Sequence, residues 1–296
     1  SALALAVGAL TVAPAPAHAA DPITTQEYFS YYHLDSARQK GYTGKGITIA
    51  LIDTPVDLSD PELAGANIVD KSRCTLEPSQ TSSPHGNSMA AILVSQQYGV
   101  APDATLYTYQ TATDGAASSG SCKQGTQELD TIANLINQAV DDGAQIISIS
   151  LSSTDHGKAL KWAITRALNE GVIIVSSMGN TAADENNAHL AWWSGVVGVS
   201  AINTDGSFAS YSSLGNGVTT AAIGGPVTIR NISSGETSTT EGTSNATALT
   251  SGMLALALQK WPEATPNQIL QSLVRSGLNP NHEWNQYTGY GAAALG

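Results

Sequence analysis

Four polar residues, Asp53, His85, Asn180 and Ser244, stand where side chains could perform acid–base and nucleophilic chemistry. A histidine is a general acid–base candidate near neutral pH. A serine at the start of a helix lies beside free backbone N–H groups, which can hold an oxyanion. An asparagine amide beyond a buried strand can add a further hydrogen-bond donor to the same crevice.

Each residue also has an ordinary structural explanation. Asp53 could cap a turn, and Ser244 could be a helix N-cap, the commonest reason for a serine at that position. His85 could be a surface residue at a helix start, and Asn180 could belong to a simple turn. Together the four residues favour a common site, because each lies at the end of a predicted strand or at the start of a predicted helix of one α/β sheet. They follow along the chain in the order Asp, His, Asn, Ser.

The elements that must position these residues alternate between strand and helix. Short apolar runs rich in Val and Ile predict buried strands over residues 47–52, 104–109, 146–151, 172–175 and 196–201. Helical patterns cover residues 126–140, 158–169, 243–260 and 266–276, and another opens at His85, where Gly86 leaves room for close backbone approach. Residues 233–243, rich in Ser, Thr and Gly, predict a loop leading into a helix.

Continuous apolar strands with helices between them are typical of an α/β fold. We therefore predict a doubly wound, mostly parallel sheet with helices on both faces. Thr265 followed by Pro266 predicts the start of the last helix, as an N-cap with proline at the first helical position. One domain accounts for the chain.

The amino-acid composition of the chain limits which classes of binding partner are expected. The 296 residues carry 12 basic and 24 acidic side chains, for a formal net charge of −12, and the basic ones are scattered. A protein that binds nucleic acid would show clustered Lys and Arg, so nucleic acid is excluded as an expected partner. We expect a monomer.

The first residues read as a targeting segment. Small apolar residues run to Ala15, and Ala17, His18 and Ala19 form the A-x-A arrangement that signal peptidase cleaves. We therefore expect residues 1–19 to be a signal peptide clipped at its N-terminus and the protein to be secreted. Residues 20–41 would be a retained arm or a propeptide remnant, and residues 42–296 the main domain.

Cys74 and Cys122 are the two cysteines of the chain. In an exported protein, two cysteines without a CxxC motif or a Cys/His cluster predict a disulfide rather than a metal or catalytic pair. Two free thiols remain the alternative.

Several motifs together resemble the subtilisin family of serine peptidases (peptidase S8), whose Asp, His and Ser catalytic residues follow in that order. The resemblance rests on segments that span nearly the whole chain after the signal: TGKGITIALID at 43–53, HG at 85–86, ISISL at 147–151, GN at 179–180, VVGVSAINTDGSFASYSSLG at 196–215 and GTS at 242–244. Signal, size and cysteine use are similar to those of the mycosins. The membrane anchor expected in that branch would lie beyond Gly296.

The resemblance implies a role for each of the four residues. Asp53 would orient His85, His85 would be the general base, Ser244 the nucleophile and Asn180 an oxyanion donor. No cofactor would be required for catalysis. Structural calcium, frequent in the family, is left open, although no Asp-rich ligand loop is evident and no metal ligand is assigned.

The resemblance also implies how substrate is held. Ser150, Leu151 and the following Ser152 would form an edge strand that pairs with a protein or peptide substrate in extended conformation.

The chain departs from the family pattern around its active residues. It has DTP in place of DTG at 53–55, HGNSMAA in place of HGTHVAG at 85–91, SLSS in place of SLGG at 150–153 and SNATA in place of SMASP at 244–248. None of these changes removes a proton-transfer or nucleophilic group. We therefore expect an active serine endopeptidase. An inactive peptide-binding protein of the same fold and an esterase that uses the same triad are the alternatives.

Overall fold

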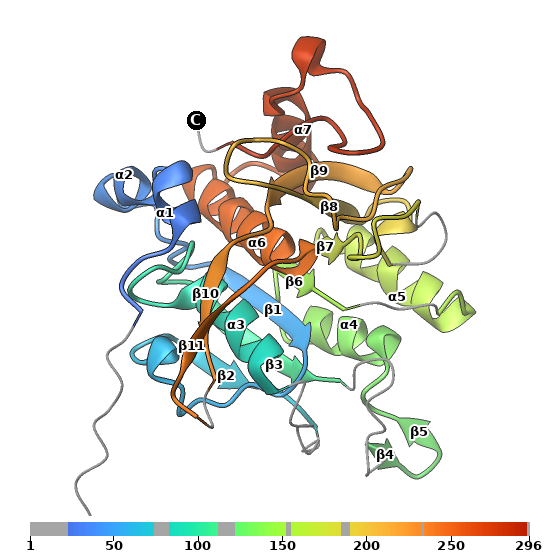
Figure 1. Ribbon diagram of the computed structural model, residues 1–296. Helices are drawn as coiled ribbons and strands as arrows, with labels where there is room; N and C mark the ends of the chain where they lie inside the picture. Colours follow the sequence, from blue (N-terminus) through green and yellow to red (C-terminus); the bar gives the residue numbers. More distant parts are fainter. Residues whose placement is uncertain are drawn as a thin grey trace, which may run out of the picture.

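A seven-stranded parallel sheet forms the centre of the computed structural model, which describes residues 23–73, 83–111, 122–151, 155–184, 190–231 and 234–294 (Figure 1). The strand order is β2-β3-β1-β6-β7-β8-β9. In chain order these strands are β1 (Thr48–Asp53), β2 (Ile68–Asp70), β3 (Thr105–Gln110), β6 (Ile146–Ile149), β7 (Ile173–Ser177), β8 (Val197–Ile202) and β9 (Val218–Ile223). The predicted α/β fold class is confirmed.

Helices cover both faces of this sheet. The α-helices are α1 (Glu27–Tyr31), α2 (Leu34–Gln39), α3 (Ser83–Val94), α4 (Ile132–Asp141), α5 (Lys158–Asn169), α6 (Thr243–Lys260) and α7 (Pro266–Ser276). The short 3-10 helices are η1 (Pro61–Leu63), η2 (Leu190–Trp192) and η3 (Pro280–His282). Among the described residues, no helix combines the length and the apolarity needed to cross a membrane.

Side-chain alternation along the strands divides the core between the two faces. Ile49 and Leu51 of β1 join the cluster that holds α3 and α6, whereas Ala50 and Ile52 join the cluster that holds α4 and α5. Both faces of β1 are apolar because both are covered, as expected of a parallel sheet.

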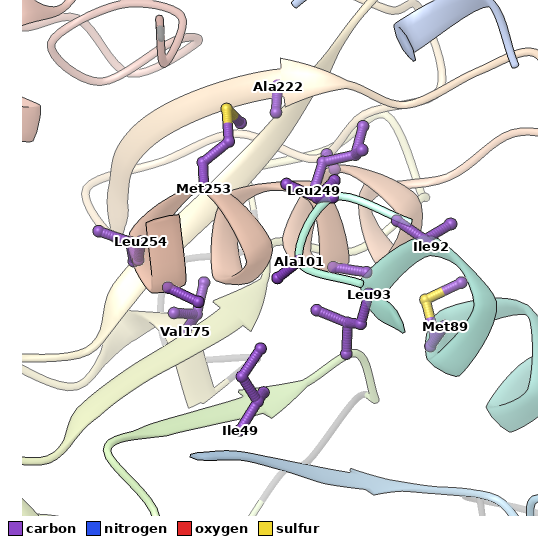
Figure 2. Close-up of a cluster of buried hydrophobic side chains, with 14 of the residues drawn as sticks. Ile49, Met89, Ile92, Leu93, Ala101, Val175, Ala222, Leu249, Met253 and Leu254 are labelled. Atoms are coloured by element: carbon purple, nitrogen blue, oxygen red, sulfur yellow. The ribbon is translucent and has the colours of Figure 1, made fainter. Parts of the chain in front are cut away.

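The two helices that carry His85 and Ser244 in their first turns, α3 and α6, share one apolar layer. Figure 2 shows Met89, Ile92 and Leu93 of α3 packed beside Leu249 and other apolar side chains of α6. This layer fixes the relative position of the two helix N-termini.

Most predicted elements occur within one or two residues of their expected bounds, and α5, α6 and α7 match them. The helix predicted over residues 126–140 is wrong at its start. Residues Gln127–Glu128 form strand β5, paired with β4 (Lys123–Gln124), and α4 begins at Ile132. The Thr131 side chain accepts a hydrogen bond from Asn134 N and so caps the helix there.

The loop predicted over residues 233–243 is also wrong in part. Thr237–Thr240 forms strand β11, which pairs antiparallel with β10 (Val227–Arg230). β-Branched threonines suit a strand, but the pairing partner lies outside the predicted segment. This hairpin passes in front of α3 in Figure 1 and leads directly into α6.

The segment before β1 packs into the domain. Tyr28, Tyr32 and Leu34 are buried in the same core cluster as α3 and α6. The Tyr32 hydroxyl accepts a hydrogen bond from Ile223 N at 2.9 Å, and Arg38 donates to Gly99 O at 2.7 Å. Residues 1–22 lie outside the described residues, so the predicted signal peptide is not tested.

Candidate active site

Asp53 and His85 form the first half of the site. The Asp53 side chain, 1% exposed at the end of β1, lies with Oδ1 2.6 Å from His85 Nδ1. Thr54 N donates to the same oxygen at 2.7 Å. The other ring nitrogen, Nε2, has no hydrogen-bond partner within the described ranges, and the His85 side chain is 33% exposed. His85 can therefore exchange a proton with a group in the crevice.

The surroundings of His85 alter its acidity. Burial by itself lowers the pKa of His85, but the negative charge of Asp53 and the hydrogen bond to it outweigh this effect. The pKa of His85 is therefore raised above its ordinary value of about 6.5. Asp53 therefore stabilises the protonated form of His85.

A close contact between backbones holds α3 against the loop after β1. Gly86 N donates to Thr54 Oγ1 at 2.9 Å. A Cβ on Gly86 would lie 2.2 Å from Thr54 O, a distance that backbone atoms cannot accommodate. The predicted need for glycine at this position is confirmed, although α3 begins at Ser83, two residues before His85.

Ser244 forms the second half of the site, in the first turn of α6. Its Oγ donates to Ser150 O at 3.1 Å, and Ser150 Oγ donates back to Ser244 O at 3.2 Å. No acceptor in the described part of the chain engages the Ser244 N–H, because the first N–H groups of a helix have no intrahelical partner. The hydroxyl and this N–H thus occupy the positive end of the helix dipole.

Asn180 is held beside Ser244 by the same helix turn. Its Oδ1 accepts from Thr243 N at 2.8 Å and from Thr243 Oγ1 at 3.1 Å. The two donors fix which end of the amide faces the helix. The Nδ2 group is left as a donor on an exposed side chain.

Sheet register brings the two halves together. Ile52 of β1 pairs with Ile149 of β6, so the next residues, Asp53 and Ser150, leave neighbouring strands at the same level. Adjacent strands lie about 4.8 Å apart. The Asp53–His85 pair and the Ser150–Ser244 pair therefore share the carboxyl edge of the sheet, where α/β proteins bind their ligands.

The predicted substrate strand is not formed. β6 ends at Ile149, a central position between β1 and β7, and Ser150 and Leu151 follow it as buried loop residues. Ser152 lies outside the described residues. The last pairs of β6 are Ile149 with Ile52 of β1 and Ile149 with Ser176 of β7. The contact of these residues with substrate stays a prediction.

Thr54, Thr243 and Asn87 are site residues that the sequence interpretation missed. Each adjoins a predicted residue or lies two positions from it, so proximity in the chain was the available signal. The Asn87 side chain is buried and hydrogen-bonds to the loop after β1. No group of three or more His, Cys, Asp or Glu side chains that could hold a metal ion occurs in the described ranges.

The chain is similar in sequence to known proteins. The profile of the subtilase family matches residues 44–291. The thermostable alkaline protease of Halalkalibacterium halodurans is 30% identical over 254 residues, which cover 82% of this chain and 65% of that protein. Subtilisin NAT of Bacillus subtilis subsp. natto is 28% identical over 246 residues, which cover 79% and 61% of the two chains. The chain thus spans slightly less than two thirds of the length of these relatives.

Solved structures share the fold. MycP1 of Mycobacterium smegmatis has a TM-score of 0.73 at 24% identity, over 96% of this chain and 85% of that one. The prenylagaramide maturation protease PagA has a TM-score of 0.71 at 23% identity, over 88% and 95%. At these identities the likeness is one of fold.

Proposed function

The chain belongs to the subtilase family, and on that premise we propose that it is an exported serine endopeptidase that cleaves peptide bonds through an acyl-enzyme. The observation that carries this proposal is the 2.6 Å contact between Asp53 and His85 at the sheet edge that also holds Ser244. Protein or peptide chains are the substrate class of this family.

The proposed reaction assigns one task to each side chain. The Ser244 hydroxyl turns from Ser150 O toward His85, whose Nε2 takes its proton while Oγ attacks the scissile carbonyl carbon. The Ser244 N–H and Asn180 Nδ2 hold the resulting oxyanion. When the C–N bond breaks, His85 gives the proton to the leaving amine, and the acyl group stays on Oγ. Water then repeats the sequence, so that the acid is released and Ser244 regains its proton.

Substrate would bind as an extended chain along residues 150–152, with main-chain hydrogen bonds holding it at the crevice. The proposed chemistry uses no cofactor, and the enzyme would act as a monomer without nucleic acid.

The arm over residues 23–41 would be retained in the mature enzyme. Gln26 is 4% exposed, and its side chain bonds to both backbone groups of Thr228 on β10, at 2.8 and 2.9 Å. Loss of this segment would remove Tyr28 and Tyr32 from the core cluster and leave Ile223 N and Thr228 N without the acceptors that Tyr32 and Gln26 provide. Cleavage by signal peptidase would then fall before Ile23.

A fluorophosphonate probe tests the proposed function. The wild-type protein should be labelled covalently at Ser244 and should hydrolyse peptide amides, because the probe reacts with a serine only when a base and an oxyanion site are assembled around it. The Ser244→Ala variant is the control for site-specific labelling. A folded wild-type protein that resists the probe and cleaves nothing would indicate a peptide-binding protein. Turnover of esters without amides would indicate an esterase.

The raised pKa of His85 predicts the acid limb of the pH profile. His85 must be neutral to accept a proton, so kcat/KM should be low when His85 is charged and rise as pH passes its folded pKa. The midpoint should lie above about 6.5, the ordinary histidine value. Measuring kcat/KM across the range from acid to mildly alkaline pH checks this. A midpoint below the ordinary value would contradict the assignment of Asp53 as its partner.

Replacing Asn180 tests the oxyanion site. The Asn180→Ala variant should lose about 10²- to 10³-fold in kcat with little change in KM, the range known for the corresponding donor in a subtilisin. The reason is that this donor acts on charge that develops only in the transition state. Asn203→Ala, which removes an asparagine from an exposed turn, is the matched control. An unchanged kcat in Asn180→Ala would mean that Asn180 only holds the start of α6 and does not stabilise the oxyanion.

The cysteine pair gives a stability prediction. Cys122 is buried, and Cys74 lies outside the described residues. If they are joined, the chain-entropy model assigns the bond roughly 4 kcal/mol, and it would brace the segment before His85. Thiol titration of the denatured, unreduced protein should find no reactive thiol. Two reactive thiols would exclude the bond.

A further inference from the structure

We propose that Asn87 is a positioning residue for the catalytic pair, because its side chain holds the loop after β1 against α3. This inference rests on the proposed function, since it concerns how Asp53 is kept in contact with His85. Asn87 occupies the position at which the sequence departs from the family's HGT motif.

Both the oxygen and the nitrogen of the Asn87 side-chain amide form hydrogen bonds to the loop after β1. Oδ1 accepts from Asp57 N at 2.8 Å, and Nδ2 donates to Asp57 O at 2.9 Å. Nδ2 also donates to Asp60 Oδ2 at 3.0 Å. The Asn87 side chain is 1% exposed, so water cannot replace these bonds if they are lost.

These bonds form the last rung of a short ladder between two segments. The first rung joins His85 Nδ1 to Asp53 Oδ1, and the second joins Gly86 N to Thr54 Oγ1. The third joins Asn87 to Asp57, in the same order along both segments. Three residues separate Asp53 from Asp57, so a loop held at Asp57 has little freedom to carry Asp53 away from His85.

The far end of the ladder is anchored to the rest of the fold. Asp60, 4% exposed, accepts from Glu62 N at 3.0 Å through Oδ1. The Glu62 carboxylate in turn accepts from Arg230 Nε at 3.0 Å, in an ion pair whose two side chains are 2% and 4% exposed. Arg230 belongs to the hairpin that leads into α6 and Ser244. The loop that Asn87 holds is therefore also linked, through Asp60, Glu62 and Arg230, to the hairpin that precedes Ser244.

If Asn87 had a purely structural role, its loss would lower stability without a specific effect on kcat. The chain offers a matched control for this alternative. Gln259, at the opposite end of α6, is a second amide clamp. Its Oε1 accepts from Thr43 N and Gly44 N, both at 2.8 Å, and its Nε2 donates to Gly41 O at 2.9 Å. Loss of either clamp should lower stability. Only loss of the Asn87 clamp should alter catalysis.

The first experiment compares Asn87→Ala with Gln259→Ala in the full chain. We measure kcat and KM on a peptide amide, the rate of fluorophosphonate labelling, and the melting temperature. Asn87→Ala should lose about 10²-fold in kcat with KM nearly unchanged, the scale of loss expected from a catalytic group misplaced by about 1 Å. Gln259→Ala should keep the wild-type kcat even where its melting temperature falls.

Exchanging the side chains of the Asn87–Asp60 pair provides a rescue experiment. Asn87→Asp alone places a second carboxylate against Asp60 and should lower kcat strongly. Adding Asp60→Asn removes the repulsion between the two carboxylates and should recover part of the loss, as a coupled pair does in a double-mutant cycle. The recovery should be incomplete, because Asp57 O still lacks the donor that Asn87 Nδ2 supplies. This comparison also decides the question if Asn87→Ala does not fold.

Two results would overturn the inference: a wild-type kcat in Asn87→Ala, or an equal loss of kcat in Gln259→Ala. Failure of the exchanged pair to recover activity beyond Asn87→Asp would do the same. All of these are read against an active wild-type enzyme. A wild-type protein without turnover or labelling would instead overturn the proposed function.

Discussion

The His85→Ala variant should hydrolyse peptide amides about 10⁶-fold more slowly than the wild-type protein, the loss that a subtilisin shows when its histidine is removed. His85 is the group placed to take a proton in the crevice, since Asp53 occupies its Nδ1 and leaves Nε2 unpartnered in the described residues. Without this base the Ser244 hydroxyl keeps its proton and is a weak nucleophile. Single-turnover assays at high enzyme concentration can measure so large a loss.

Another histidine supplies the control for this variant. His156 is an exposed residue whose ring lies 6.3 Å from that of Trp193, on the loop before α5. His156→Ala should keep wild-type rates and label normally with the fluorophosphonate probe. If His85→Ala kept more than a small fraction of activity, the proton acceptor would have to be another group, and the proposed reaction would fail.

The Asp53→Asn variant should lose about 10⁴-fold in kcat, as the equivalent change does in a serine protease of another fold. Asn is nearly the same shape, so β1 and the loop after it should be retained. Its amide can present an N–H to His85 Nδ1, where the carboxylate accepts one, and the ring is then held in the wrong tautomer. Loss of the negative charge also removes the interaction that raises the pKa of His85. The measurements are kcat, KM and the midpoint of the pH profile.

Asp35→Asn is the charge-matched control, because Asp35 is an exposed carboxylate on α2. It should keep kcat, since α2 contributes no residue to the Asp53–His85 pair or to the Ser150–Ser244 pair. Equal losses in the two variants would point to a general field of negative charge in place of a specific hydrogen bond.

The Ser150–Ser244 contact determines how the Ser244 hydroxyl is oriented before substrate binds. The Ser244 hydroxyl donates to Ser150 O and has no hydrogen bond to His85 in the described structure. In the proposed reaction the Ser244 hydroxyl must therefore rotate about the Cα–Cβ bond before it reacts. Catalytic hydrogen bonds in unliganded enzymes are often long or misaligned and tighten when substrate binds, so this geometry is compatible with the proposed reaction.

The sequence alone predicted the layout of the fold and the four central residues. Apolar runs of Val and Ile specify buried parallel strands with little help from the rest of the chain, because both faces of each strand must be apolar. The bounds of α5, α6 and α7 were predictable for a similar reason. Their apolar spacing, caps and flanking residues are local signals. Asp53 and Asn180 were recognisable because they follow such strands, and Ser244 because it opens such a helix.

Only the tertiary structure decided how these residues are held. Strand β11 needs β10 to pair with, and β5 needs β4, so neither strand could be read from its own segment. The clamp of Asn87 on Asp57 spans 30 residues of chain, and the ion pair of Glu62 with Arg230 spans 168. Hydrogen bonds between distant residues leave no periodicity in a sequence, whereas burial of a strand or a helix face does. The sequence therefore determined which groups could react, and long-range packing decided which of them meet and what keeps them in place.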